Sequence, residues 1–495
     1  MAALLATGYR VATPIKTRSH RSLLLLALPL AALWVAWPNR HASVAACADE
    51  LPLPAKHFQL RGAASCAAVA CHNASGPLGS KGAEYSTWIT RDPHTKAYTA
   101  LYNSRSQGIE QALYRLPSGK YARAEKDTLC LKCHGIDMDQ GDRAPLSLSD
   151  SFSCESCHGP AEKWLSQHYL ADWRQKSIRA KADLGMRATK DLLVRAEMCV
   201  SCHVGGPDRE VNHDLIAAGH PRLNFEYSSF LAILPKHWDE RDEKRRYPDL
   251  EARTWAIGQA ASARAALQLL AARAEPKNRR LWPEFAEYDC FACHHDLQSP
   301  SWRQERDVKK YAKSQEGPKA GALPWGTWYM SMLPEALATQ QPTSDSQLLA
   351  LINGIRSEMG KTYPNPEHIA SQARVAADGL HAYLSSLASA DYADGAILNQ
   401  LLASIARDHR KVAAANWDGA AQVYLALTAV YQAQADVDPL RRDRRLASHF
   451  NEMVSCLGFP KVDVGAYSSP RDMLHADAAR KFLQELERIQ DHLGR

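Results

Sequence analysis

The last third of the chain carries apolar residues at helical spacing. In residues 346–495 they recur three or four positions apart, which places them on one face of a helix. Asn416 precedes one run as a candidate N-cap, and Ser469 with Pro470 marks the start of the last helix. The four runs are Leu348, Leu351, Ile352 and Ile355; Leu380, Tyr383, Leu384 and Leu387; Trp417, Ala420, Val423, Tyr424, Leu427 and Tyr431; and Leu474, Phe482, Leu486 and Ile489. We therefore expect a helical bundle over residues 346–495.

Residues 49–300 have a different pattern, rich in turn-forming residues and with little alternation of apolar and polar positions. Such a pattern predicts few strands, and short helices are expected instead. One alanine-rich stretch at about 250–274 predicts a long helix. Lysine, glycine, proline and glutamine gather in residues 301–345, which we interpret as a linker. The expected fold is mainly α, with a first domain over 49–300 and the helical bundle after the linker.

The first 48 residues have the order of a secretory signal peptide. Arg10, Lys16, Arg18 and Arg21 come first, an apolar run follows at 23–37, and Ala46-Cys47-Ala48 resembles a cleavage site. The apolar run is shorter than the roughly 20 residues that span a membrane. A retained N-terminal anchor, or a lipoprotein modified at Cys47, are the two alternatives. We expect export to the periplasm or the extracellular space.

The charge balance argues against a nucleic-acid partner. The whole chain has a formal net charge of +6, but residues 1–48 hold five Lys or Arg and no acidic residue, so the remainder carries about +1. Without a basic stripe, no nucleic-acid binding is expected. The 45% hydrophobic and 23% charged residues are ordinary for a globular protein.

Cysteine and histidine carry the most specific signal. Ten of the twelve cysteines form five pairs, and each pair is followed at once by histidine. Four pairs read C-x-x-C-H, and the first has four residues between its cysteines. The five motifs are Cys66/Cys71/His72, Cys130/Cys133/His134, Cys154/Cys157/His158, Cys199/Cys202/His203 and Cys290/Cys293/His294.

This spacing is that of covalent haem attachment. Two thiols add to the two vinyl groups of one haem, and the adjacent histidine binds the iron as its proximal ligand. Zinc sites also use C-x-x-C pairs but do not require the histidine, and disulfides are the default in exported proteins. Five repeats of the histidine favour haem, so we predict five haem c groups. Cys47 and Cys456 belong to no motif, and Cys456 is expected to be a buried thiol.

Other histidines are candidates for the sixth position of each iron. His94, His168, His213 and His220 lie between or just after the motifs and are favoured. His213 and His220 either share a helical face or separate if Gly219 breaks the turn. His237 and His57 are weaker candidates, and His295 has no clear assignment. The ten expected iron ligands are His72, His134, His158, His203, His294, His94, His168, His213, His220 and His237.

The motifs resemble those of the tetrahaem cytochrome c-554 family over roughly residues 55–225. The first motif is followed by His94-Thr95-Lys96-Ala97-Tyr98, like the family's H-A-K-A segment, and residues 154–160 read C-E-S-C-H-G-P. The resemblance implies that His94 and His168 are distal ligands. It also implies a five-coordinate second haem, which here is the one at His134. The chain departs from the family in its longer first motif and in a fifth motif at residues 290–294.

These features predict a multihaem cytochrome that carries electrons along five haems. Its expected partners are other redox proteins or a quinol-linked membrane donor. The alternative is an enzyme that acts on a small nitrogen or sulfur species at one open iron. A third interpretation is a docking subunit of a redox complex, with the helical tail as its interface. No motif ends in C-x-x-C-K, so a lysine-ligated catalytic haem is not indicated.

Overall fold

A computed structural model gives the structure of most of the chain beyond its N-terminal segment. It describes residues 58–116, 123–135, 152–275, 281–294, 323–339, 345–409, 412–413, 416–438, 443–458 and 476–494. The expected signal peptide, most of the expected linker, His57, His295 and the Ser469–Pro470 helix start lie outside these residues.

Helices account for the regular structure of the described residues, which confirms the mainly α fold. The only β pairings there are two isolated bridges, Gly206 with Arg209 and Tyr288 with Trp325. No described helix is both long enough and apolar enough to span a bilayer.

The N-terminal half is built from short elements, as its turn-rich sequence predicts. Most begin at an aspartate, asparagine or serine whose side chain accepts a backbone N–H, as Asn103, Asp127, Asp191 and Asn212 do. These α-helices are α2 (Glu84–Arg91), α3 (Ser104–Leu113), α4 (Thr128–His134), α5 (Cys154–His158), α6 (Ile178–Ala182), α7 (Leu192–His203), α8 (His213–Ala217), α9 (Tyr227–Ile233) and α10 (Glu240–Arg246). The 3₁₀ turns among them are η1 (Ala63–Cys66), η2 (Pro93–Lys96), η3 (Thr99–Tyr102), η4 (Ala124–Lys126) and η6 (Ala171–Gln175).

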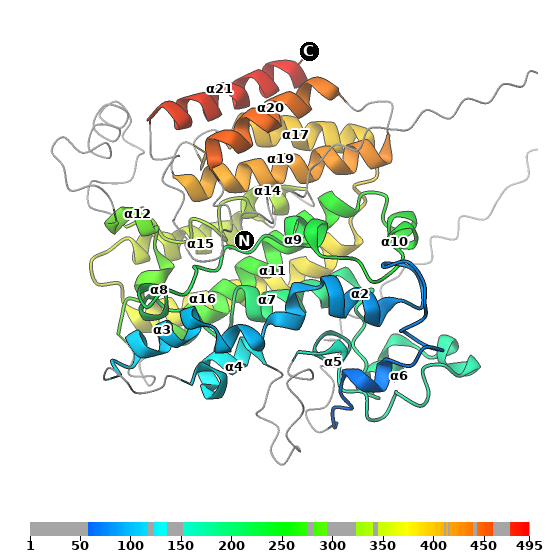
Figure 1. Cartoon of the computed structure of the whole chain (residues 1–495). Coiled ribbons are helices and arrows are strands. Elements are labelled where there is room, and N and C mark those ends of the chain that lie inside the picture. The colour runs from blue at the N-terminus through cyan, green and yellow to red at the C-terminus, as the bar shows by residue number, and fades with distance from the viewer. Residues whose placement is uncertain are drawn as a thin grey trace, which may run out of the picture.

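One long helix, α11 (Leu250–Arg273), confirms the helix expected at about 250–274. Alanine fills much of its surface, so neighbouring helices approach it closely, and nineteen of its residues are buried. It packs on α7 and α9 from the N-terminal half and on three helices from the C-terminal half, α14, α16 and α19. Figure 1 shows α11 in the middle of the molecule, between the short helices and the C-terminal layers.

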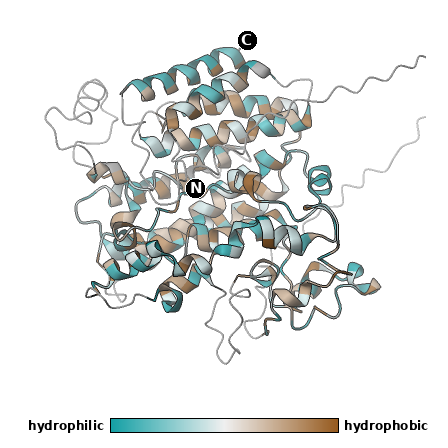
Figure 2. Cartoon of the chain, viewed as in Figure 1, coloured by the Kyte–Doolittle hydropathy of each residue, from teal (hydrophilic) through white to brown (hydrophobic). Residues whose placement is uncertain are grey.

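The C-terminal half is the expected bundle. The predicted cap is confirmed, since the Asn416 side chain accepts the N–H of Gly419 at 2.8 Å. Apolar side chains face inward, and the visible face of the outermost helix, α21, is largely hydrophilic (Figure 2). The elements after α11 are η8 (Phe285–Glu287), α12 (Cys290–Cys293), α14 (Leu333–Ala338), α15 (Asp345–Met359), α16 (Pro366–Ser389), α17 (Gly395–Asp408), α19 (Trp417–Val437), α20 (Arg444–Leu457) and α21 (Ala476–Leu493).

A single hydrophobic core crosses the expected boundary at residue 300. It runs from Leu192 in α7 through Trp255 in α11 to Ile489 in α21. A smaller cluster of Ala161, Trp164 and Trp173 lies apart from it, beside the third motif. The helical bundle is therefore packed directly against the part of the chain that carries the fourth and fifth motifs.

Candidate haem-binding sites

The C-x-x-C-H motifs lie on helical turns that the local sequence fixes. Motifs two and four form the ends of α4 and α7, motif three is the whole of α5, and the two cysteines of motif five are the first and last residues of α12. Cysteines three positions apart on a helix project from the same side, so both can reach one ring. The longer first motif begins in η1 and continues through turns. All ten motif cysteines are free thiols, so the disulfide interpretation is wrong for them.

Each motif histidine lies opposite a second histidine from a distant part of the chain. The ring centres of the five pairs are between 5.9 and 6.4 Å apart. The pairs are His72 with His168 (6.1 Å), His134 with His220 (6.4 Å), His158 with His237 (6.2 Å), His203 with His94 (5.9 Å) and His294 with His213 (6.2 Å). These ten residues are the ten that the sequence singles out, with no histidine shared between two pairs.

That separation fits two imidazoles bound to opposite sides of one metal ion. With metal–nitrogen bonds of about 2.0–2.1 Å, the ring centres of two such ligands lie about 6.3 Å apart. The rings of His72/His168 and His213/His294 are nearly parallel, at 12° and 22°. The other three pairs cross at 70° to 85°. The residues present therefore fit a haem at each motif, whose iron the two facing histidines would hold.

In five of the ten paired histidines, a hydrogen bond at Nδ1 leaves Nε2 available to bind a metal. A ligating histidine commonly donates its other ring N–H to a carboxylate or a backbone carbonyl, which fixes the ring orientation. Two rings have a carboxylate partner and three have a carbonyl partner. The bonds are His72 to Glu84 Oε2 (3.2 Å), His94 to Asp92 Oδ1 (2.8 Å), His134 to Ala97 O (2.8 Å), His168 to Leu165 O (2.7 Å) and His220 to Pro221 O (2.8 Å).

Burial keeps several of these imidazoles in the neutral form that binds metals. It lowers the pKa of His158 and of His203 to about 4 each. Burial also lowers the pKa of His220 and His237. All four rings are thus uncharged at neutral pH, as ligation requires.

Cysteines of different motifs touch, which shows that the motifs are neighbours in space. The Cys66 and Cys154 side chains lie close enough to shift the pKa of each other, which brings motifs one and three together. In the same way the Cys133 and Cys202 side chains shift the pKa of each other, which brings motifs two and four together. Cys199 lies near enough to Cys157 for an electrostatic interaction, so motifs three and four also adjoin.

The second and fifth motifs are linked through their histidine partners. His213 and His220 stand in one short segment, and they face the fifth and the second motif respectively. Gly219 separates them, because its φ of +116° ends the turn after α8. The alternative in which the glycine splits the two histidines is therefore the one the structure adopts.

Some functional contacts were absent from the sequence interpretation. Asp92 and Glu84 hold two of the histidines, and only the Asp-Pro-His order at residues 92–94 gives a local signal for the first. His237, a weak candidate, faces His158, since the segment after α9 returns to the third motif. His220 faces His134, so the ring expected to lie at an open iron has a partner too.

The alternative of zinc sites finds no support in the part of the chain that the structure covers. Nowhere among those residues do three or more His, Cys, Asp or Glu side chains converge on one point. Paired histidines are what a haem needs, because the porphyrin itself supplies the other four iron ligands.

Comparison with known proteins adds one match. The family model described as "Cytochrome c554 and c-prime" matches residues 65–159, which contain the first three motifs. Searches of curated proteins and of solved structures return no match. Over residues 65–159 the chain is similar to c-type cytochromes, which supports covalently bound haem c and a role in electron transfer.

Proposed function

We propose that this chain is an exported cytochrome that binds five haem c groups and conducts electrons along them. The observation that carries the proposal is the set of five histidine pairs, one for each Cys/His motif. Each haem, when bound, supplies an iron that changes reversibly between the ferrous and ferric states. Paired histidines favour low-potential electron transfer over the binding of small molecules.

The residues around the pairs have the properties that electron transfer needs. The ten cysteines would hold the rings covalently, and the histidines would fix the iron positions. Apolar side chains exclude water from His203. The Phe225 ring, 3% exposed, stacks on the His203 ring with ring centres 5.0 Å apart. The Phe230 and His203 rings meet edge to face with ring centres 5.3 Å apart. Such a dry and rigid environment limits reorganisation when charge moves.

The contacts between motifs support one spatial order. Motif one touches three, three adjoins four, four touches two, and two is joined to five by the segment with His213 and His220. The ends of this series are the more exposed: Cys71, Cys293 and His294 reach the surface, whereas His203 and Cys199 are half-buried. We propose that electrons enter at one end and leave at the other.

An enzyme acting at an open iron is the weaker candidate. Every motif histidine within the described residues has a second histidine opposite it, so nothing observed favours a vacant position. Redox proteins or a quinol-linked membrane donor stay as proposed partners. Membrane association through an uncleaved or lipidated N-terminus is likewise a proposal, as is a periplasmic or extracellular location.

Haem counting and spin-state spectroscopy test the proposal together. Pyridine haemochrome analysis of the matured protein is expected to give five haems per chain, all of them low-spin. Two or fewer haems would overturn the haem assignment. A high-spin signal in the unmodified protein would instead favour the enzyme. His368→Ala, which removes an exposed histidine at the start of α16 that belongs to none of the five pairs, should give the same haem count and spin state.

A further inference from the structure

The segment over residues 211–223, here called the ligand strap, carries two of the five partner histidines. His213 begins α8 and faces His294, while His220 follows the turn at Gly219 and faces His134. Its backbone is irregular except for the five residues of α8. Whatever fixes the ligand strap therefore fixes histidines for two different motifs.

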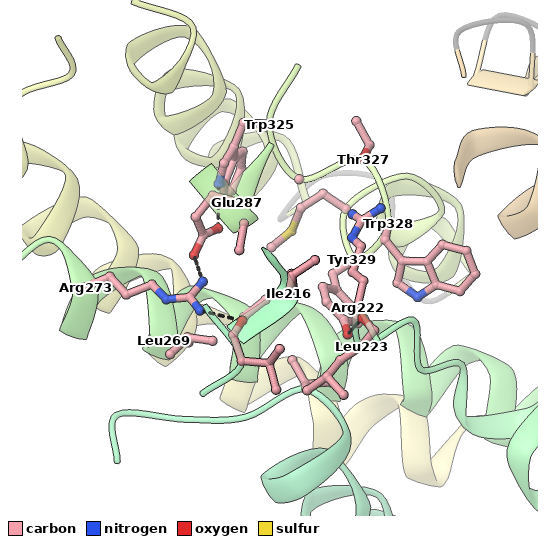
Figure 3. A pocket seen from close by; sticks show the side chains of 16 residues that line it. Ile216, Arg222, Leu223, Leu269, Arg273, Glu287, Trp325, Thr327, Trp328 and Tyr329 are labelled. Carbon is pink, nitrogen blue, oxygen red and sulfur yellow. Dashed lines mark hydrogen bonds and ion pairs between the residues drawn. The ribbon is translucent and has the colours of Figure 1, made fainter. Parts of the chain in front are cut away.

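Buried ionic contacts hold the first end of the ligand strap. The Arg273 guanidinium of α11, 5% exposed, donates to Glu210 Oε2 at 2.9 Å and to the Val211 carbonyl at 3.1 Å. It also donates to Glu287 Oε1 at 2.8 Å. Trp325 Nε1 completes the group by donating to the other oxygen of Glu287 (Figure 3).

The second end is held by residues of the C-terminal half. Arg222 donates to both oxygens of Asp418 at 3.1 and 2.9 Å, and the Asp418 side chain is only 4% exposed. Thr327 Oγ1 donates to the same carboxylate at 2.5 Å. Asp418 is the second residue of α19, so this contact ties the strap directly to the helical bundle.

Two aromatic residues add hydrogen bonds to the backbone on the same side. The Tyr329 hydroxyl donates to the Leu223 carbonyl at 2.7 Å, and Trp328 Nε1 donates to the Phe225 carbonyl at 2.9 Å. A small cavity of about 60 Å³ separates the two anchored ends and is lined by both sets of residues (Figure 3).

We propose that the C-terminal bundle is a clamp, in which Asp418 acts as a positioning residue that keeps His220 opposite His134. The inference rests on the proposed function and adds a role for the helical half. Arg222 is two residues from His220, so a displacement of Arg222 moves the backbone that carries this histidine. A ligand is held in productive geometry only when its supporting contacts are themselves fixed.

Asp418→Asn is the variant that tests the clamp. It keeps the shape of the side chain but removes the carboxylate that Arg222 hydrogen-bonds, and Asp289 is then the remaining acidic group near this guanidinium, which disfavours the present arrangement. We expect a high-spin haem that binds carbon monoxide, with a spectrum matching His220→Ala and not His213→Ala. Asp436→Asn is the matched control on the same helix, since Asp436 pairs with Lys244 at 2.6 Å away from the strap. This control should stay low-spin.

The outcome separates the clamp from the proposed function. Five haems that all stay low-spin in Asp418→Asn would overturn the clamp and leave the proposed function intact. Two or fewer haems in the unmodified protein would overturn the function itself. Should Asp418→Asn fail to accumulate, the double variant Arg222→Met/Asp418→Leu decides, because replacing both charges by apolar groups preserves folding more often than removing one. A high-spin haem there supports the clamp, and a wholly low-spin protein overturns it.

Discussion

The Asp92 carboxylate lies 2.8 Å from Nδ1 of His94, and only 7% of its side chain is exposed. A buried anion hydrogen-bonded to a ligating imidazole makes that imidazole a stronger donor and stabilises ferric iron. Asp92→Asn is therefore expected to raise the potential of the haem at His203, on the order of 60 mV, a tenfold change in a one-electron equilibrium. A spectroelectrochemical titration measures it.

A comparison with an exposed aspartate isolates this effect. Asp172 is 62% exposed and pairs with Lys176, so Asp172→Asn removes the same charge where solvent screens it. All five potentials should be nearly unchanged in that variant. Equal titration curves for the Asp92 and Asp172 variants would contradict a role of Asp92 in setting the potential.

His237 faces His158 with ring centres 6.2 Å apart. His237→Ala is expected to convert the third haem to a high-spin form that binds carbon monoxide, without lowering the haem count, because the cysteines still attach the ring. Optical and electron paramagnetic resonance spectra give the spin state. His381→Ala in α16, which removes a half-buried histidine that belongs to none of the five pairs, is the control. An unchanged low-spin spectrum of His237→Ala would show that another group binds the sixth position of this iron.

Local sequence patterns anticipated much of the fold but not its long-range pairings. The Asn416 cap and the apolar spacing of α16 and α19 are set by neighbouring residues, so the sequence displays them. The cysteine spacing is equally local. Which histidine faces which motif depends on contacts between residues far apart, such as His72 with His168, and no local signal encodes them.

Contacts between distant residues also determine how the N-terminal and C-terminal halves of the chain pack together. The change in composition at residues 301–345 predicted a linker before a helical bundle, and the sequence left open whether that bundle packs on the first domain, as α16 and α19 do on α11. The spacing of apolar residues also does not reveal which polar side chains are buried. Arg222 and Asp418 are 196 positions apart, and only the folded chain brings them together.

Glu155, within the third motif, is 2% exposed and accepts three backbone N–H groups. They are those of Gly62 at 2.8 Å, Ala161 at 2.6 Å and Arg61 at 2.9 Å. Glu155→Gln replaces one acceptor by a donor that faces these N–H groups, which should cost about 1–3 kcal/mol in the free energy of unfolding. Denaturant titration followed by circular dichroism measures this loss.

Glu162→Gln provides the comparison for Glu155. Glu162 accepts the N–H of the exposed Gln59 at 2.7 Å, and its side chain is 19% exposed, so solvent reaches this contact. Water replaces the lost contact there, so little change in stability is expected. Equal losses in the two variants would mean that burial of Glu155 is not what makes it important.

Hydrogen bonds from the Arg445 side chain and backbone, and then from His492, lower the pKa of Asp443. A carboxylate with a depressed pKa in the folded state stabilises the fold above its unfolded pKa near 3.8, and this contribution is lost as the pH falls. Asp443→Asn keeps the N-cap of α20 but removes the charge. The stability advantage of the unmodified protein over this variant, on the order of 1 kcal/mol or less at neutral pH, should shrink progressively as the pH falls below the unfolded pKa near 3.8. An advantage that is constant with pH would exclude the linkage.

Gly219, in the turn after α8, and Gly108, in α3, make a matched pair for the last prediction. The two segments are in contact, since the Arg105 side chain of α3 donates to the Gly219 carbonyl at 2.9 Å. Gly219 has a φ of +116°, and an added Cβ would lie 3.5 Å from Ile109, so backbone strain and not lack of space opposes a side chain. Gly219→Ala should lower the free energy of unfolding by about 1–3 kcal/mol and displace His220, which would give a partly high-spin second haem.

Gly108 lies within α3 with no atom near its Cβ position, so Gly108→Ala should stabilise the protein by roughly 0.5–1 kcal/mol. Thermal unfolding and the spin state of each variant check both statements, and a Gly219→Ala protein as stable and as low-spin as Gly108→Ala would refute the role assigned to the turn.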